Sequence, residues 1–357
     1  MKRKVLLLAM ALELGGAETH VITLAQGLKE AGLEVQVMSA GGSLARLLGE
    51  AGIPHRPAPL NRRSPLLIAE GIRQVARAIR EWQPHLLHAH ARLPAWIAAQ
   101  ARKGTTLPLV ITYHGLYRHT GLWRYVNTWG DAVVAISPEV RRHLVDQLHA
   151  PAEKVHVIPN GVDTRRFQPP QREPSGFHIV HVSRLDETIA PALALVEAVG
   201  ELRASFPALR ATIAGDGRQR AAVEEAARGK VAMAGALQDP LPLLQDAFAV
   251  VGAGRSLLEA MACGRPVIVA GQGGLGGLLT PGNWRSLSET NFSGRGVGRP
   301  LTGKSLAQEI RILLDDGEMA KRLGVENRRI VEEHFSRQKM LSDLLALYER
   351  LWPRENM

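Results

Sequence analysis

The segment best suited to bind a polar ligand spans residues 250–271, VVGAGRSLLEAMACGRPVIVAG. A strand-like apolar run ends at two glycines, and Arg255 and Glu259 follow in the first turns of a predicted helix. Glycine lets a ligand approach the backbone closely, and the free N–H groups of a helix N-terminus bind anions. This pattern predicts a site for a phosphate-bearing ligand. Its expected lining is Gly252, Ala253, Gly254 and Arg255.

Two further glycine loops follow predicted strands. Gly15 and Gly16 stand in LELGGAETHV, just before an amphipathic segment, and Gly215 and Gly217 stand in IAGDGRQR. Ligands of open parallel sheets bind beyond the carboxyl ends of the strands, where such loops lie. Both loops are therefore predicted ligand contacts, and an ordinary turn is the alternative for Gly215 and Gly217.

The elements that would position these loops alternate along the chain. Continuous apolar strands separated by helix-length segments predict parallel sheets covered on both faces, and 357 residues are enough for two such domains. The proline-rich segment 169–174 is the expected linker, which gives domains over residues 1–170 and 171–335. An amphipathic helix over about residues 336–353 packs either on the second domain or back on the first.

The order of several motifs along nearly the whole chain resembles the retaining GT-B glycosyltransferases of family four. The motifs are GGAETHV, HAHA, TYHG, VIPNGVDTRRFQP, HVSRLD, IAGDG and LLEAMACGRPVIV. The resemblance implies two Rossmann-like domains facing each other across a cleft. The first would shape the acceptor site, and the second would bind a nucleotide-diphosphate sugar of UDP or GDP type. It also implies transfer with retention, no metal and no other cofactor, and a last helix that returns to the first domain.

The same resemblance implies roles for individual residues. Arg184 would bind the diphosphate, because a planar guanidinium suits phosphate, and an ion pair with Asp186 is the structural alternative. Glu259 would accept hydrogen bonds from the ribose hydroxyls, and His114 would lie near the transferred sugar. Further expected contacts are main-chain groups from Gly235 to Leu237 for the base and, less specifically, His90; His88 is expected to point the other way along its strand.

Two charged residues of the family pattern are missing from this chain. A glutamate that contacts the donor sugar falls on Val251, eight positions before Glu259, and a lysine falls on Ile189 or Ala190. Loss of a charge-assisted contact aimed at developing charge costs on the order of 3 kcal/mol unless it is replaced. Arg255 is the expected replacement, and we expect an altered but active site.

Composition limits the partners and the surroundings. A single cysteine, Cys263, cannot form an intramolecular disulfide, and we expect a small buried residue. Residues 1–168 hold 21 Lys and Arg against 12 Asp and Glu, which predicts an anionic partner such as a membrane surface, or else an ordinary solvated surface. No nucleic-acid recognition motif is present, and no apolar run is long enough to span a membrane.

Two segments bear on the membrane. Residues 66–82 predict a helix with an apolar stripe and a basic one, which lies either on a membrane or against its own sheet. Residues 113–129 interleave aromatic residues with arginine, a pattern that we interpret as an interface rather than as core.

The predicted function is therefore a retaining glycosyltransferase at the cytoplasmic face of a membrane, acting on a lipid-linked or cell-envelope acceptor. One alternative is a non-catalytic protein of the same fold that senses a nucleotide sugar or serves as a partner subunit, which Val251 would favour. Others are an epimerase of nucleotide sugars, which would need no acceptor, and a phosphorylase, which would lack affinity for a nucleotide.

Overall fold

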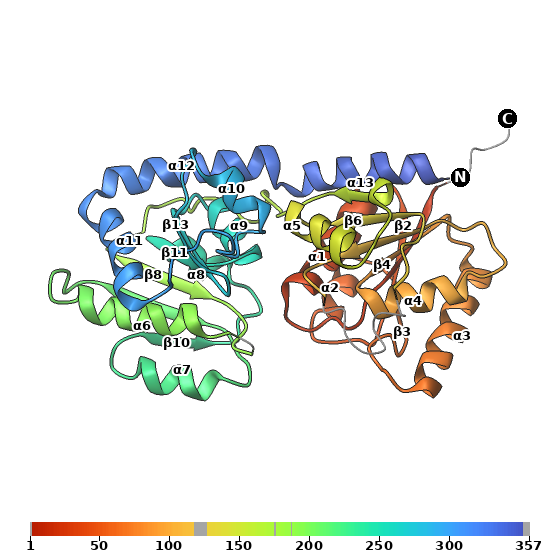
Figure 1. Cartoon of the computed structure of the whole chain (residues 1–357), viewed down its shortest axis with the longest axis horizontal. Helices are drawn as coiled ribbons and strands as arrows, with labels where there is room; N and C mark the ends of the chain where they lie inside the picture. The colour runs from red at the N-terminus through yellow and green to blue at the C-terminus, as the bar shows by residue number, and fades with distance from the viewer. Residues whose placement is uncertain (1, 118–126, 175, 187, 353–357) are drawn as a thin grey trace. The chain divides into compact units, whose positions relative to one another are not determined.

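The protein folds into two compact α/β units, each built around one sheet (Figure 1). The computed structural model describes residues 2–117, 127–174, 176–186 and 188–352. The first unit holds residues 1–161 and 337–357, and the second holds residues 162–336. Within the described residues, no helix is both long and apolar enough to cross a membrane.

The first unit contains a parallel sheet of seven strands in the order β3-β2-β1-β4-β5-β6-β7. The order reverses between β1 and β4, which is where ligands bind in such sheets. The strands are β1 Lys4–Leu8, β2 Glu34–Ser39, β3 His55–Pro57, β4 Leu86–His90, β5 Leu109–Tyr113, β6 Ala132–Ala135 and β7 Val155–Val157. The helices are α1 Gly16–Glu30, α2 Ala45–Glu50, α3 Pro65–Trp82, α4 Arg92–Ala101, α5 Pro138–Arg142, a π-helix at His143–Gln147, a 3₁₀ turn at Ala152–Lys154, and α13 Arg337–Leu351.

The C-terminal helix α13 belongs to the first unit. It packs beside α1, and buried Arg337 at its start binds Glu30 of α1 at 2.7 Å. The Tyr348 hydroxyl lies 2.6 Å from Nδ1 of His88 on β4. The amphipathic helix expected at the C-terminus thus covers one face of the first sheet.

The second unit contains a six-stranded sheet in the order β10-β9-β8-β11-β12-β13, in which only the β12–β13 pair is antiparallel. Here the order reverses between β8 and β11. The strands are β8 His178–Val182, β9 Arg210–Ala214, β10 Ala232–Gly235, β11 Ala249–Gly252, β12 Val267–Gly271 and β13 Gly274–Leu278. The helices are α6 Ala190–Leu202, α7 Arg220–Ala227, α8 Leu241–Asp246, α9 Arg255–Ala262, α10 Trp284–Glu289, α11 Gly303–Asp315 and α12 Gly317–His334.

The two units meet in sequence after Gly161, before the boundary predicted after residue 170. Val162 and Phe167 are buried in the core of the second unit, and Glu173 lies 3.5 Å from buried Arg265. The proline-rich segment therefore packs on the second unit instead of linking the two. Proline marks an interruption of regular structure, but it does not show which core a segment contacts.

Alternating side chains of the central strands enter separate cores on the two faces of each sheet. On β11, Val250 belongs to one buried cluster of the second unit and Val251 to the other. This arrangement explains why the strands are apolar throughout, as parallel strands covered on both faces must be.

Candidate functional site

Arg184 lies at the point where the second sheet reverses its strand order. It follows β8, and its backbone is held on both sides. The Ser183 N–H donates to the Ala214 carbonyl at 3.1 Å, and the Leu185 N–H donates to the Asp216 carbonyl at 2.9 Å. A cation on a fixed loop at this edge of the sheet suits an anionic ligand.

The Arg184 side chain is exposed and makes no ion pair or hydrogen bond with the described residues. Asp186, the alternative partner considered from the sequence, instead accepts a hydrogen bond from the backbone N–H of Arg218 at 3.0 Å. The guanidinium of Arg184 is therefore available to an external anion.

Gly215 and Gly217 bring the loop after β9 against the loop that carries Arg184. Their φ angles are 151° and 153°. A Cβ atom on Gly215 would lie 1.9 Å from the Ser183 carbonyl oxygen, and one on Gly217 would lie 2.5 Å from the Leu185 carbonyl carbon. Glycine is required at these positions because the two loops pack too closely to leave room for a side chain. Contact of these glycines with a ligand stays a prediction.

The loop from β11 to α9 consists of Ala253 and Gly254 alone. The Ala253 N–H has no hydrogen-bond partner among the described residues. The Gly254 N–H points to the Phe292 carbonyl at 3.4 Å, so this amide, expected to bind a ligand, is already engaged. The first N–H groups of α9 have no acceptor within the helix, and they lie at the same edge of the sheet as Arg184.

Arg255 and Glu259 form an ion pair one turn apart on α9. Arg255 Nε lies 2.8 Å from Glu259 Oε1, and each side chain is 9% exposed. Burial raises the pKa of Glu259, while the charges of Arg255 and then Arg166 act in the opposite direction. Arg255 was expected to be a free phosphate ligand. In the structure it instead holds the Glu259 carboxylate, and contact with a phosphate stays a prediction.

Sequence reasoning missed Arg166 as part of this group. Its guanidinium lies 2.8 Å from Asp239, and both side chains act electrostatically on Glu259. Arg166 stands in VIPNGVDTRRFQP, a motif that marked only a boundary in the sequence. The basic residues of this motif could have indicated an anionic neighbour, and the motif lies in the second unit, as Glu259 does.

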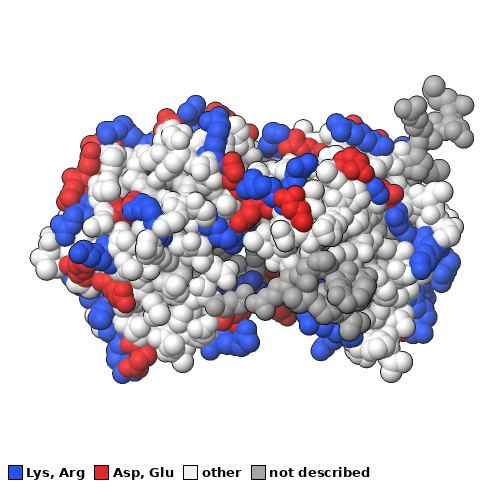
Figure 2. Space-filling view, viewed as in Figure 1, with Lys and Arg blue, Asp and Glu red and all other residues white. Residues whose placement is uncertain are grey.

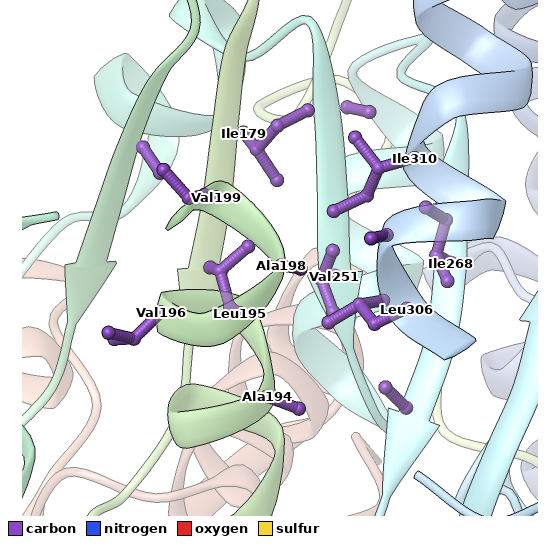
Figure 3. Packing of buried hydrophobic residues seen from close by; sticks show 14 of the residues in the cluster. Ile179, Ala194, Leu195, Val196, Ala198, Val199, Val251, Ile268, Leu306 and Ile310 are labelled. Atoms are coloured by element: carbon purple, nitrogen blue, oxygen red, sulfur yellow. The ribbon is translucent and has the colours of Figure 1, made fainter. Parts of the chain in front are cut away.

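Val251 is a core residue of β11 and does not line the loop. It is fully buried with Ile179, Leu195 and Leu306 (Figure 3). The β11–α9 loop is so short that the position eight residues before Glu259 falls inside the strand, where a carboxylate would lack water and a partner. Position 251 is therefore a core position of this chain and offers no contact to a ligand at the loop.

The remaining predicted positions lie at the same end of the second unit. Ile189 directly precedes α6, and its side chain packs against the apolar core. The Gly235 carbonyl accepts the Gly215 N–H at 2.7 Å, which ties the predicted base-binding segment to the loop after β9. Leu237 is half-buried. Ile189 and Ala190 themselves are apolar, so the cation expected at this position is missing from their side chains.

His181 of β8, for which the sequence predicted no role, connects the two sides of the reversal point. Its Nδ1 lies 2.8 Å from the Val251 carbonyl oxygen and its Nε2 lies 2.8 Å from the Ser183 hydroxyl. The carbonyl accepts, so Nδ1 carries the proton and the neutral Nε2 accepts from the hydroxyl. Burial lowers the pKa of this histidine.

Acid pH is expected to destabilise the second unit through His181. A folded-state pKa below the ordinary 6.5 means that only the unfolded chain binds the proton as the pH falls from neutral. Stability is therefore full above about pH 6.5 and falls by up to about 1.4 kcal/mol per pH unit below it. Urea unfolding of native protein and His181→Asn at pH 7 and pH 5 measures this. An equal loss of stability in both proteins would contradict the assignment to His181.

In the first unit, His20, His90 and His114 lie together where β1 and β4 meet. His90 ends β4, His114 follows β5, and His20 lies on α1. His90 Nδ1 and His114 Nε2 are 3.1 Å apart. Gly15, which precedes α1, has an extended φ of 177°, so the backbone there requires no glycine. Contact of Gly15 and Gly16 with a ligand stays a prediction.

The expectation that His88 points away from His90 is wrong. The two ring centroids are 4.4 Å apart, because residues i and i+2 of a strand share one face. His88 is fully buried, and its two nitrogens lie 2.6 Å from the Tyr348 hydroxyl and 2.7 Å from the Thr112 hydroxyl. It is a saturated core residue that connects β4 to α13 and β5.

Of the described aromatic residues in the segment 113–129, Tyr113 is buried in the core, whereas Tyr117 and Trp129 are partly buried against it, so the interface interpretation of this segment stays a prediction. Tyr113 is fully buried, with Tyr117 and Trp129 at ring-centroid distances of 5.3 and 6.0 Å. The Arg92 guanidinium lies 5.2 Å from the Tyr117 ring centre. Trp123, Tyr125 and the arginines 118 and 124 lie outside the described residues.

Cys263 is buried at the end of α9, as expected. Burial raises the pKa of its thiol to about 12. A thiol in this state is no nucleophile at neutral pH.

Comparison with known proteins identifies relatives of both units. Residues 14–166 match the family model described as Glycosyltransferase Family 4, and residues 176–316 match the one described as Glycosyl transferases group 1. A glycogen synthase of Mycobacterium tuberculosis is 26% identical, with 94% of this chain and 91% of that protein aligned. A phosphatidyl-myo-inositol mannosyltransferase of Propionibacterium freudenreichii is 27% identical over 72% of this chain and 73% of its own.

A solved structure resembles the whole chain. The Anabaena protein HepE, crystallised with UDP, superposes with a TM-score of 0.76 at 20% identity and covers 98% of this chain and 100% of its own. At this level of identity the likeness shows the fold.

Proposed function

Because the chain belongs to the GT-B glycosyltransferases of family four (glycosyl transferases group 1), which use nucleotide-sugar donors, we propose that it transfers a sugar with retention from a nucleotide-diphosphate donor. The donor would bind to the second unit, at the reversal point of its sheet. The presence of UDP in the HepE structure supports a uridine nucleotide, with a guanosine nucleotide as the alternative.

The observation that carries this proposal is the exposed guanidinium of Arg184, which pairs with none of the described residues and lies at the same sheet edge as an N–H group without a described acceptor. Ala253 supplies that group, and the first turn of α9 supplies more. In the reaction, charge develops on the oxygens of the leaving diphosphate, and donors that are already in place stabilise it. These groups provide a cation and amide donors for that charge, so we propose that transfer needs no metal ion.

Glu259 would hold the ribose. Its carboxylate is oriented by Arg255, and one carboxylate can accept hydrogen bonds from both ribose hydroxyls. Arg166 and Asp239 would set the charge around it. His114 would contact the sugar or the acceptor as a neutral hydrogen-bonding group, because burial lowers its pKa to about 4.

A thermal-shift panel with UDP, GDP, ADP, CMP and dTDP, followed by transfer assays with the matching nucleotide sugars, tests the proposal. One nucleotide should stabilise the protein, and NMR of the product should show the anomeric configuration of the donor. Inversion would contradict the retaining mechanism. Stabilisation without transfer to any acceptor would favour a sensor, and conversion of the donor alone would favour an epimerase.

We further propose that the acceptor is lipid-linked and that the first unit meets an anionic membrane at its cytoplasmic face. The name of the Propionibacterium relative, which specifies phosphatidyl-myo-inositol, supports a lipid acceptor. The apolar side of α3 packs on its own sheet, with Val75 fully buried. Its other side faces solvent, where Leu66 at its first turn is 82% exposed.

A cavity of about 520 Å³ between β3 and α3 is lined by a group of arginines. They are Arg56, Arg73, Arg77 and Arg80. Glu70 and Glu81 neutralise part of this charge, while Arg80 makes no ion pair among the described residues. On the face drawn in Figure 2, basic and acidic side chains are interspersed over each unit, so a membrane contact would depend on a local group such as this one.

Substitution of Arg73, Arg77 and Arg80 by glutamine is expected to weaken binding to phosphatidylserine-containing vesicles about a hundredfold, since each cation near such a surface contributes about 1 kcal/mol. Vesicle sedimentation at 0.05 and 0.5 M salt measures the effect, and native binding should fall at high salt. Replacement of Arg203, Arg228 and Arg329 of the second unit is the matched control. Equal binding to vesicles without anionic lipid would contradict the electrostatic contact.

A further inference from the structure

Three histidines of the first unit form a compact cluster at the reversal point of its sheet. The rings of His20, His90 and His114 have pairwise centroid distances of 4.9, 5.4 and 5.5 Å. One nitrogen of each ring lies within 4.8 Å of a nitrogen of the other two. Three separate elements supply them, so the cluster exists only in the folded unit.

These spacings match those of a three-histidine metal site. In a tetrahedral zinc site with Zn–N bonds of about 2.0–2.1 Å, ligand nitrogens lie about 3.4 Å apart and ring centres about 5 Å apart. His90 Nδ1 and His114 Nε2 are 3.1 Å apart, and the three centroid distances average close to the zinc value. A His20 nitrogen lies within 4.8 Å of both, so this ring would have to move closer to coordinate the same ion.

The chemical state of the rings also suits a metal ion. His20 and His90 are 2% and 3% exposed, and an imidazole with the ordinary pKa of about 6.5 is mostly neutral at pH 7. Neutral imidazole is the form that binds metals. His90 and His114 share one proton in their hydrogen bond; both nitrogens become ligands once that proton moves to the opposite nitrogen of its ring.

The neighbouring groups limit which residues take part. His88 lies beside His90, but the Tyr348 and Thr112 hydroxyls occupy both of its nitrogens, so it is not a ligand. His90 Nε2 and His114 Nδ1 are buried with no hydrogen-bond partner among the described residues. Ligands without such outer partners bind a metal more weakly, so an exchangeable ion is expected rather than a permanent one.

We propose that His20, His90 and His114 form a site for a transition-metal dication such as Zn²⁺, with three imidazole ligands and an open fourth position. An all-nitrogen ligand set favours Zn²⁺, Co²⁺ or Ni²⁺ over Mg²⁺ and Ca²⁺. The ion is not a cofactor of the proposed transfer. The bound ion inhibits that transfer because it occupies His114. The inhibition rests on the proposed function, whereas the metal site does not.

The test uses the full chain freed of metal with a chelator and without nucleotide sugar or acceptor, so its result is independent of the transfer. Zn²⁺ is titrated calorimetrically, and Co²⁺ is followed by its visible ligand-field bands. We expect one ion per chain. His20→Gln and His114→Gln should each weaken binding at least a hundredfold, since loss of an outer partner alone costs 10- to 100-fold. His156→Gln, a half-buried histidine elsewhere in the unit, should bind as the native protein does.

Two further measurements keep the result interpretable. Circular dichroism confirms that each variant is folded. X-ray absorption of the native zinc complex, which needs no substitution, should show three imidazole nitrogens at about 2.0–2.1 Å. Absence of stoichiometric binding, binding that survives either substitution, or an equal loss in His156→Gln would overturn the proposal.

Discussion

Replacement of Arg184 by alanine is expected to lower kcat for sugar transfer about a hundredfold, the usual effect of removing one donor to developing charge. The melting temperature should change by no more than about 1 °C, because substitution of an exposed side chain that makes no structural contact has little effect on stability. Arg184 is exposed and pairs with no described residue, which is why activity and stability separate here. Steady-state kinetics and a thermal melt measure the two effects.

Two controls identify the physical origin of the loss. Arg184→Lys keeps the charge but not the planar fork, so it should recover only part of the activity. Arg228→Ala removes another exposed arginine, which pairs with Glu225 at 2.6 Å and does not lie at the strand reversal, so kcat should be unchanged. An unchanged kcat in Arg184→Ala would rule out a contact between Arg184 and the diphosphate.

Replacement of Glu259 by alanine is expected to abolish nucleotide binding and also to destabilise the second unit. In the native protein, a nucleotide at a hundred times its Kd contributes about 2.7 kcal/mol, or a few degrees in Tm, and this shift should disappear. Removal of the carboxylate breaks the buried ion pair with Arg255, which costs about 3–5 kcal/mol. Thermal shift with and without nucleotide reports both changes.

A double variant separates these two effects of Glu259. In Arg255→Met combined with Glu259→Leu, apolar side chains replace the buried pair, so most of the stability should return. Nucleotide binding should stay absent, because no acceptor for the ribose is present. A double variant that is stable and still binds the nucleotide would show that Glu259 is only a structural partner of Arg255.

The pattern of strands and helices was predictable because it depends on residues that are close together in the sequence. Parallel strands buried on both faces are continuous apolar runs, and glycine stands where loops approach each other, as at Gly215. The motifs also predicted Arg184 and Glu259, and both lie at the reversal point of the second sheet. The roles assigned to them stay predictions until ligand binding is measured.

Other residues were misplaced or missed because their surroundings depend on distant parts of the chain. From the sequence, Val251 stands where the family pattern has an acid at the ligand site. In the structure it is buried in the core against α6 and α11. His20 meets His114 across 94 residues of chain only because α1 lies on the same edge of the sheet as the end of β5. Arg166 belongs to the second unit because the units meet after Gly161. This placement, which the chain around Arg166 does not reveal, brings its charge close to Glu259.

The sequence by itself determined two α/β units, the loops that leave their strands, and the residue types able to bind a nucleotide sugar. These properties depend on periodicity and on backbone conformation, which neighbouring residues control. Only the tertiary structure decided that Arg184 pairs with no described residue while Arg255 pairs with Glu259, and that three histidines meet. Burial, pairing and protonation state depend on which distant groups surround a side chain, because desolvation and Coulomb interactions act through space and not along the chain.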